Sequence, residues 1–246
     1  GGATGGPGVL LEHPWELGGR IHVERDADAG LVGRPQEPAG LHRVAREQAQ
    51  DLSSGLGKII RIDTSGNAPA DNPFVGQAGA NARVWSYGHR NQQGLARDPV
   101  TGRIFQTEHG ALSGDEVNVI EKGANYGWPI ATYSVDYSGA VISPFTEKEG
   151  TVQPIAVWKP ERFAPSGLAV YRGTLFPQWD GDLLAGSLAE MRVDRLDLDD
   201  TGKVVGWQRL FTELQTRIRD VRTGPDGAVY LLTDEEDGKI LKVTPR

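Results

Sequence analysis

The chain has 246 residues, a formal net charge of −7, 33 glycines and no cysteine. Its acidic balance argues against nucleic acid as the main partner, because binding phosphates requires a basic face. The lack of cysteine excludes disulfides and thiolate chemistry. No run of 18 apolar residues occurs, so no membrane span is predicted. Abundant glycine disfavours helices and favours short strands joined by turns.

The first part of the chain differs in composition from the rest. Residues 22–48 contain no Ile, Phe, Tyr or Trp and can supply little core. The sharpest change falls near Ala49, so we expect a divergent or degraded segment over 1–48 and a well-patterned domain over 49–246. The best helix candidate is residues 41–52.

Asp-Gly turns followed by strands recur along the patterned domain. Asp bonds nearby backbone N–H groups and Gly accepts positive φ, while the residues that follow alternate or run apolar as in strands. This pattern favours a radial architecture of small antiparallel sheets, with a β-sandwich as the alternative. The segments are residues 97–107, 198–207, 223–234 and 236–243.

A Gly-rich segment, residues 107–129, carries the acids Glu108, Asp115 and Glu116 together with His109. Carboxylates and exposed carbonyls in such loops suit Ca²⁺, which collects six to eight oxygen ligands. The alternative is a solvated hairpin whose acids cap backbone N–H groups.

A second polar segment, residues 215–227, alternates Arg217 and Arg219, which a strand would place on one face. Two guanidiniums on one face form a receptor for carboxylate or phosphate. The alternative is a solvent-facing stripe paired with nearby acids. The tyrosines of residues 125–139 could stack on a planar ligand or fill a core.

Four stretches, WSYGHRNQQGLA (85–96), TEHG…GDEVNVI…GANYGWP (107–129), PSGLAVY (165–171) and RIRDVRTGPDGAVYLLTDE (217–235), together resemble one family. This is the family of soluble aldose sugar dehydrogenases that use pyrroloquinoline quinone (PQQ), the soluble glucose dehydrogenases. The resemblance runs from about Ala49 to Arg246. It implies an all-β fold, a six-bladed β-propeller of four-stranded antiparallel blades. Six blades need more residues, so we expect one propeller domain over 1–246 that is N-terminally truncated or incomplete.

The resemblance also implies the ligands of the site. Asn91 and its neighbour would reach PQQ, and the paired arginines would lie over the cofactor. The matched PQQ positions are Arg90, Asn91, Tyr137, Arg217, Ile218 and Arg219. The carbonyls of Gly110 and Ala111 match the ligands of a Ca²⁺ that bridges to PQQ, and Glu116 and Tyr126 match a second, structural Ca²⁺ site.

The sequence departs from the family pattern at several of these positions. Gln92 and Ala111 each replace a proline, and Ala189 stands where a lysine often faces the cofactor. Glu16 aligns with the histidine that is the family's general base, with His13 and His22 nearby. A carboxylate there could accept the sugar proton, and the catalytic base is otherwise unknown.

The resemblance implies an enzyme that oxidises aldoses such as glucose to lactones and passes the electrons to an external acceptor. The alternative is a catalytically impaired propeller that binds Ca²⁺, and PQQ or sugar, without turnover. An unrelated acidic β-protein with structural Ca²⁺ is the third hypothesis. The family's members work in the periplasm or outside the cell. The sugar, the acceptor and the oligomeric state are left open.

Overall fold

The computed structural model describes residues 19–23, as backbone, and residues 46–245. These residues form strands, turns and short 3₁₀ helices, so the predicted all-β class is confirmed. They divide into two compact units. Unit 1 holds the residues up to Arg90 with Glu121–Ile130 and Lys148–Val152; unit 2 holds Asn91–Ile120, Ala131–Glu147 and Gln153–Arg246. No helix among the described residues is long and apolar enough to cross a membrane.

Unit 1 contains a three-stranded antiparallel sheet of β1 (Gly19–Val23), β2 (Lys58–Asp63) and β3 (Val84–Tyr87). The fully buried Lys58 donates three hydrogen bonds, of 2.7 to 3.0 Å, to backbone carbonyls of residues 48, 49 and 56. The three carbonyls supply one acceptor for each proton of the ammonium group.

The helix expected over residues 41–52 is largely wrong where the structure describes it. Only residues 46 and 47 are helical, and the N–H groups of residues 49–51 bond the carbonyls three residues earlier. The carbonyls of residues 48 and 49 are held by Lys58, and that tertiary contact favours a turn over continued helix.

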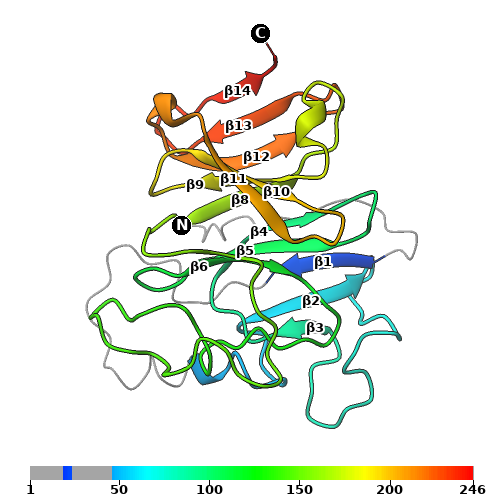
Figure 1. Cartoon of the computed structure of the whole chain (residues 1–246). Helices are drawn as coiled ribbons and strands as arrows, with labels where there is room; N and C mark the ends of the chain where they lie inside the picture. The colour runs from blue at the N-terminus through cyan, green and yellow to red at the C-terminus, as the bar shows by residue number, and fades with distance from the viewer. Residues whose placement is uncertain (1–18, 24–45, 246) are drawn as a thin grey trace, which may run out of the picture. The chain divides into compact units, whose positions relative to one another are not determined.

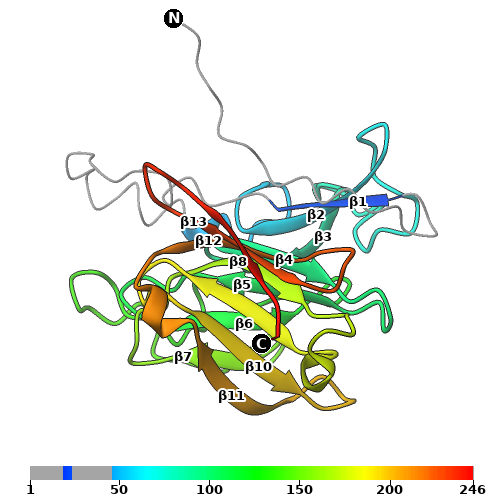
Figure 2. The same ribbon diagram turned by 90° about the horizontal axis from the view of Figure 1, so that it is seen from above.

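Unit 2 contains three antiparallel sheets, each a meander of consecutive strands. The inner strand of each sheet, β4, β8 or β12, opens its meander. Strand β8 lies beside both β4 and β12, so the sheets follow one another like blades (Figure 1, Figure 2). The first sheet is β4 (Gln92–Arg97), β5 (Ile104–Glu108), β6 (Asp115–Val119) and β7 (Ala156–Trp158). The second is β8 (Pro165–Val170), β9 (Leu183–Ser187), β10 (Val193–Leu198) and β11 (Val204–Leu210). The third is β12 (Ile218–Thr223), β13 (Val229–Thr233) and β14 (Ile240–Val243).

The predicted Asp-Gly turns are confirmed as the hairpins of these sheets. In the β4–β5 hairpin Asp98 accepts the N–H of residue 100 at 3.0 Å, and Gly102 has φ +76°. In the β10–β11 hairpin Asp199 accepts the N–H of Thr201 at 2.9 Å, and Gly202 has φ +86°. Local sequence chemistry therefore fixes where these strands reverse.

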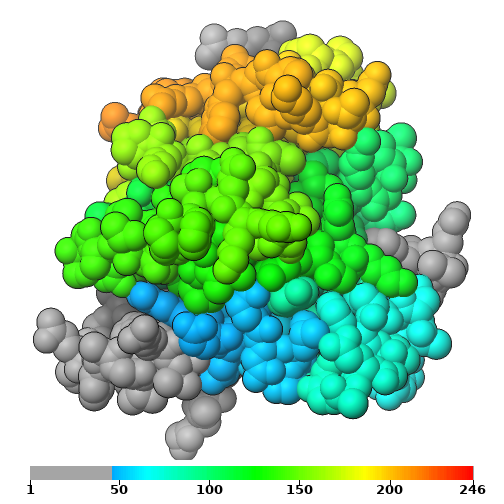
Figure 3. Space-filling view, turned by 60° about the horizontal axis from the view of Figure 1, so that its bottom comes forward, coloured from blue at the N-terminus to red at the C-terminus, as the bar shows by residue number. Residues whose placement is uncertain are grey.

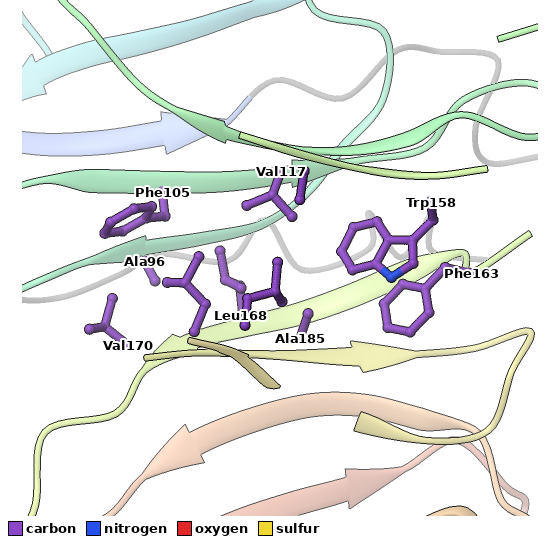
Figure 4. Close-up of a cluster of buried hydrophobic side chains, with 11 residues drawn as sticks. Ala96, Phe105, Val117, Trp158, Phe163, Leu168, Val170 and Ala185 are labelled. Atoms are coloured by element: carbon purple, nitrogen blue, oxygen red, sulfur yellow. The ribbon is translucent and has the colours of Figure 1, made fainter. Parts of the chain in front are cut away.

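Two apolar clusters hold the blades of unit 2 together. The first joins the β4–β7 and β8–β11 sheets, and in it the rings of Trp158 and Phe163 stack with centroids 4.1 Å apart (Figure 4). The second joins the β8–β11 and β12–β14 sheets around Tyr171, Ile218 and Leu231. Both clusters include side chains of the β8–β11 sheet, which fixes the middle blade against its two neighbours.

The outermost strand of the middle sheet, β11, lies at the surface. Its residues are mostly exposed, and Val205 and Trp207 are 61% and 43% exposed. In the space-filling view this strand and the 3₁₀ helix η3 (Thr212–Leu214) form the orange surface (Figure 3). The blade therefore grades from a buried inner strand to an exposed outer one.

Candidate functional site

The inner strands of unit 2 begin at one end of the unit. Asn91 immediately precedes β4, and the ring of His109, just after β5, bonds the carbonyl of Pro165 at the start of β8 with Nε2···O of 2.7 Å. The hydroxyl of Ser166 donates to the carbonyl of Ile218 at the start of β12, at 2.5 Å. The first bond joins the end of β5 to the start of β8, and the second joins the starts of β8 and β12, so the segments predicted to hold PQQ and Ca²⁺ meet at this end.

Asn91 is 5% exposed, and its neighbours fix it on three sides. Its backbone carbonyl accepts the N–H of His109 at 2.9 Å. Its Oδ1 accepts a hydrogen bond of 2.7 Å from Nε2 of Gln93, and its Nδ2 lies 3.4 Å from Nδ1 of His109. The side chain is therefore ordered before any ligand arrives.

The predicted arginine pair is present at the start of β12. Ile218 is fully buried, so Arg217 and Arg219 project away from the core on either side of it. Both contact Asp234: Nε of Arg217 lies 2.7 Å from Oδ2, and Nη2 of Arg219 lies 2.9 Å from Oδ1. The two arginine side chains are 48% and 47% exposed.

Asp234 is a residue that the sequence reasoning missed. It follows β13, whose end lies opposite the start of β12, as the pairing of Ile218 with Thr233 shows. Burial raises the pKa of Asp234, but the two guanidiniums together lower it by more, so the pKa lies below its usual value. One carboxylate thus balances one of two positive charges, and Nη1 and Nη2 of Arg217 remain available to an anionic ligand. Its sequence signal, an acid directly after a strand, is too common to have found it.

The predicted Ca²⁺ loop after β5 is tightly folded. The N–H of Gly110 bonds Oδ1 of Asp115 at 2.8 Å, and the N–H of Ala111 bonds Oγ of Ser134 at 2.5 Å. A Cβ on Gly110 would lie 2.1 Å from the carbonyl oxygen of Ser113, so only glycine fits there.

Among the described residues no three acidic, histidine or cysteine side chains converge on a metal position. A cation at the Ca²⁺ loop would therefore rely on carbonyl oxygens, the hard donors that Ca²⁺ prefers. The rigid loop, with its N–H groups already bonded, fits that requirement.

Glu116 lies on β6 opposite Glu108 on β5, and both are buried. Burial and the charge of Glu108 raise the pKa of Glu116 well above its usual value. Nδ2 of Asn118, also on β6, donates hydrogen bonds to Oε2 of Glu116 at 3.4 Å and to Oε1 of Gln106 at 3.2 Å. Two carboxylates alone do not complete a Ca²⁺ shell, so a second ion here would need carbonyl ligands as well.

Unit 1 carries two of the predicted ligand-binding residues, Arg90 and Tyr126. The guanidinium of Arg90 lies 5.3 Å from the ring centre of Trp128, a cation–π contact. Tyr126 stacks on the buried His89 with ring centres 4.5 Å apart, and its hydroxyl accepts the N–H of residue 121 at 2.8 Å. Trp128 was also missed as a partner of Arg90.

The other predicted residues lie apart from these contacts. Tyr137 lies on a loop of unit 2 and is 62% exposed, and Ala189 lies in the exposed β9–β10 turn. Glu16 and His13 lie outside the described residues. His22 lies in β1, with its backbone paired to Ile60.

The sheets of unit 2, which follow one another as blades, define a β-propeller, with the arginine pair and Asp234 at the start of its strand β12. The sequence profile of the family described as glucose/sorbosone dehydrogenase matches residues 12–242. The chain therefore belongs to the glucose/sorbosone dehydrogenase family.

Three similar proteins illustrate this membership. The aldose sugar dehydrogenase YliI of Escherichia coli is 46% identical over 204 residues, which cover 82% of this chain and 54% of YliI. A crystal structure of a glucose dehydrogenase shares 42% identity with a TM-score of 0.83, covering 94% of this chain and 62% of that one. The PQQ-bound aldose sugar dehydrogenase of Streptomyces coelicolor shares 31% identity with a TM-score of 0.62, covering 80% and 54%. The chain spans about half the length of the curated relatives it matches.

Proposed function

We propose that this chain carries the cofactor end of a PQQ- and Ca²⁺-dependent aldose dehydrogenase, which oxidises an aldose at C1 to a lactone. The observation that carries the proposal is the meeting of Asn91, the Gly110–Ala111 loop and the Arg217–Arg219 pair at the starts of the inner strands. A scaffold with no ligand has no need to gather these groups at one end.

The charges of this end suit PQQ, which carries three carboxylates. Arg217 and Arg219 hold two positive charges against the single charge of Asp234, so a net positive charge remains for an anion. Planar guanidiniums bind carboxylates with two parallel hydrogen bonds. We assign Arg217, Ile218 and Arg219 to one side of the cofactor, with Asn91 at the start of β4, on the other side of β8. By the family resemblance Arg90 and Tyr137 complete the set.

When bound, PQQ supplies a two-electron acceptor and Ca²⁺ supplies a Lewis acid beside it. The chain's own part is to hold these groups. The Gly110 and Ala111 carbonyls would bind the ion from a loop that two hydrogen bonds keep in place. Glu116 and Tyr126 are the residues proposed to hold the second ion. The amide of Asn91, fixed by Gln93 and His109, would hydrogen-bond the cofactor.

The sugar proton must pass to a base as C1 is oxidised, and Glu16 is the aligned candidate. The second candidate function is a propeller that binds the cofactor without turnover. It is favoured by Ala189, which leaves the β9–β10 turn without the family's usual positive charge. We also propose that the electrons leave to an external acceptor and that the protein works in the periplasm or outside the cell, as the resemblance implies.

The test is a titration of the purified apo chain with PQQ, with and without Ca²⁺, followed by glucose and a dye acceptor. Saturable Ca²⁺-dependent binding with dye reduction is expected from the dehydrogenase. Binding without dye reduction would identify the impaired propeller. If PQQ fails to bind in both conditions, the proposed function is wrong for this chain.

A further inference from the structure

One histidine at the cofactor end has a role that neither the metal nor the cofactor assignment uses. We propose that His109 is a positioning residue that fixes which way the side-chain amide of Asn91 faces. This proposal rests on the proposed function, since it concerns how Asn91 meets the cofactor.

The contacts of the imidazole decide its tautomer. The carbonyl of Pro165 can only accept, so Nε2 of His109, 2.7 Å away, carries the proton and donates. In the neutral ring Nδ1 then has a lone pair and accepts. It lies 3.4 Å from Nδ2 of Asn91, which makes a long hydrogen bond from the amide to the ring.

The opposite side of the amide is also held. Oδ1 of Asn91 accepts Nε2 of Gln93 at 2.7 Å. Turning the amide by half a rotation would place its oxygen against the lone pair of His109 and its N–H₂ group against the N–H₂ group of Gln93. Gln93 could turn its own amide to match, but the ring of His109 is anchored on Pro165, so its contact with the turned amide would stay repulsive and one orientation is favoured.

The fixed orientation leaves a defined ligand face. The amide of Asn91 has two N–H donors and two oxygen lone pairs. His109 uses one of the N–H donors, and Gln93 uses one of the lone pairs. The second N–H and the second lone pair of Asn91 keep fixed directions, in a side chain that is 5% exposed. A pre-ordered amide loses less conformational freedom on binding. Because His109 is anchored on Pro165, the amide is also tied to the start of β8.

Two substitutions separate the two bonds of the ring. His109→Asn keeps an acceptor at the position of Nδ1 but cannot reach Pro165, whereas His109→Gln can still donate to Pro165 but has no acceptor for Asn91. If the bond to Asn91 is the one that matters, H109N keeps the parent affinity for PQQ. H109Q then weakens the affinity about fivefold, close to the effect of Asn91→Ala, because one hydrogen bond is worth about 1 kcal/mol. Thermal unfolding of each variant establishes that it folds.

A second measurement needs no cofactor. Nitrogen-15 NMR of the apo chain should show His109 protonated at Nε2 only, and the side-chain N–H₂ signals of Asn91 should move in H109Q and stay in H109N. The positioning role would be overturned if His109 carried its proton at Nδ1, or if the side-chain signals of Asn91 did not change in H109Q. So would PQQ affinity that falls in H109N and persists in H109Q, which would make His109 a cross-link between sheets. A parent chain that binds no PQQ would instead overturn the proposed function, and the NMR result would still decide whether His109 orients Asn91.

Discussion

Removing either arginine of the pair should weaken PQQ binding, and the structure sets the size of the effect. A hydrogen bond to a charged group contributes about 1.5–3 kcal/mol when buried, whereas exposed ion pairs contribute about 0.2–1 kcal/mol. Arg217 and Arg219 are 48% and 47% exposed, so an intermediate value applies. We expect Arg217→Gln or Arg219→Gln to cost about 1–1.5 kcal/mol, roughly a tenfold rise in Kd.

The assay is a titration of the apo chain with PQQ at saturating Ca²⁺, at low and high ionic strength. Screening weakens interactions with half-exposed charges, so the difference between parent and variant should shrink as salt rises. The matched control is Arg222→Gln on the same strand. Its guanidinium lies 3.0 Å from Asp220 and its side chain is 38% exposed, but it stands away from the strand start.

We expect Arg222→Gln to leave the Kd unchanged within about a factor of two, well below a 1 kcal/mol effect. The reasoning would be refuted if Arg222→Gln weakened binding as much as Arg217→Gln. It would also be refuted if a parent chain that binds PQQ lost nothing in either variant of the pair. Similar losses in all three variants would point to net charge alone.

Three further outcomes follow from buried polar groups and from the loop after β5. Asp194→Asn should lower the free energy of unfolding by about 3–5 kcal/mol in urea titrations, because this fully buried carboxylate accepts two indole N–H groups and lies 2.7 Å from Arg192. Burial raises the pKa of Asp98, but hydrogen bonds from Arg172, Thr101 and the N–H of residue 100, with the charge of Arg172, together hold that pKa well below its usual value. Stability should therefore fall as pH drops below about 4, and Asp98→Asn should reduce this loss of stability at low pH. Gly110→Ala should abolish the Ca²⁺-dependent part of PQQ binding, because its Cβ would lie 2.1 Å from a carbonyl oxygen.

Each of these outcomes has a control and a contrary result. Asp200→Asn changes the same kind of residue on an exposed turn, and equal stability losses in the two variants would contradict the burial argument for Asp194. If Asp98→Asn and the parent lose the same stability at low pH, other carboxylates govern that loss. The control is Gly238→Ala, whose added Cβ would lie 3.4 Å from its nearest neighbour, and it should bind PQQ and Ca²⁺ like the parent. If Gly110→Ala also bound them like the parent, the loop after β5 would not be part of the Ca²⁺ site.

The strand reversals were predictable from the sequence because their causes are local. The side chain of Asp199 bonds the N–H of Thr201, two residues away, and Gly202 supplies the positive φ. Such contacts need no knowledge of the rest of the fold. The arginine pair was predictable for the same reason, since a strand period of two puts Arg217 and Arg219 on one face and the buried Ile218 between them on the other.

The contacts that complete the site were not predictable, because they join residues far apart in sequence. Asp234 reaches the arginines through strand pairing, across 15 and 17 residues. The ring of His109 meets the carbonyl of Pro165 across 56 residues. No spacing rule indicates such partners before the sheets are placed. Within the described residues the helix expected over 41–52 is present only at residues 46 and 47, since Lys58 holds the carbonyls of residues 48 and 49 in a turn.

The end of unit 2 that we propose holds the cofactor is assembled from the starts of strands in three different sheets, so its geometry depends on how those sheets pack. Asn91 belongs to the first, Pro165 to the second and Arg217 to the third. Among the described residues of unit 2, the regular hydrogen bonding lies within each sheet, and the sheets are joined by the two apolar clusters and by single side-chain bonds such as that from Ser166. Apolar packing has little directional preference, whereas a hydrogen bond weakens as its distance and angle depart from their optimum. The clusters therefore supply most of the adhesion between blades, and the buried polar links at the strand starts set the register in which the ligand-binding groups meet.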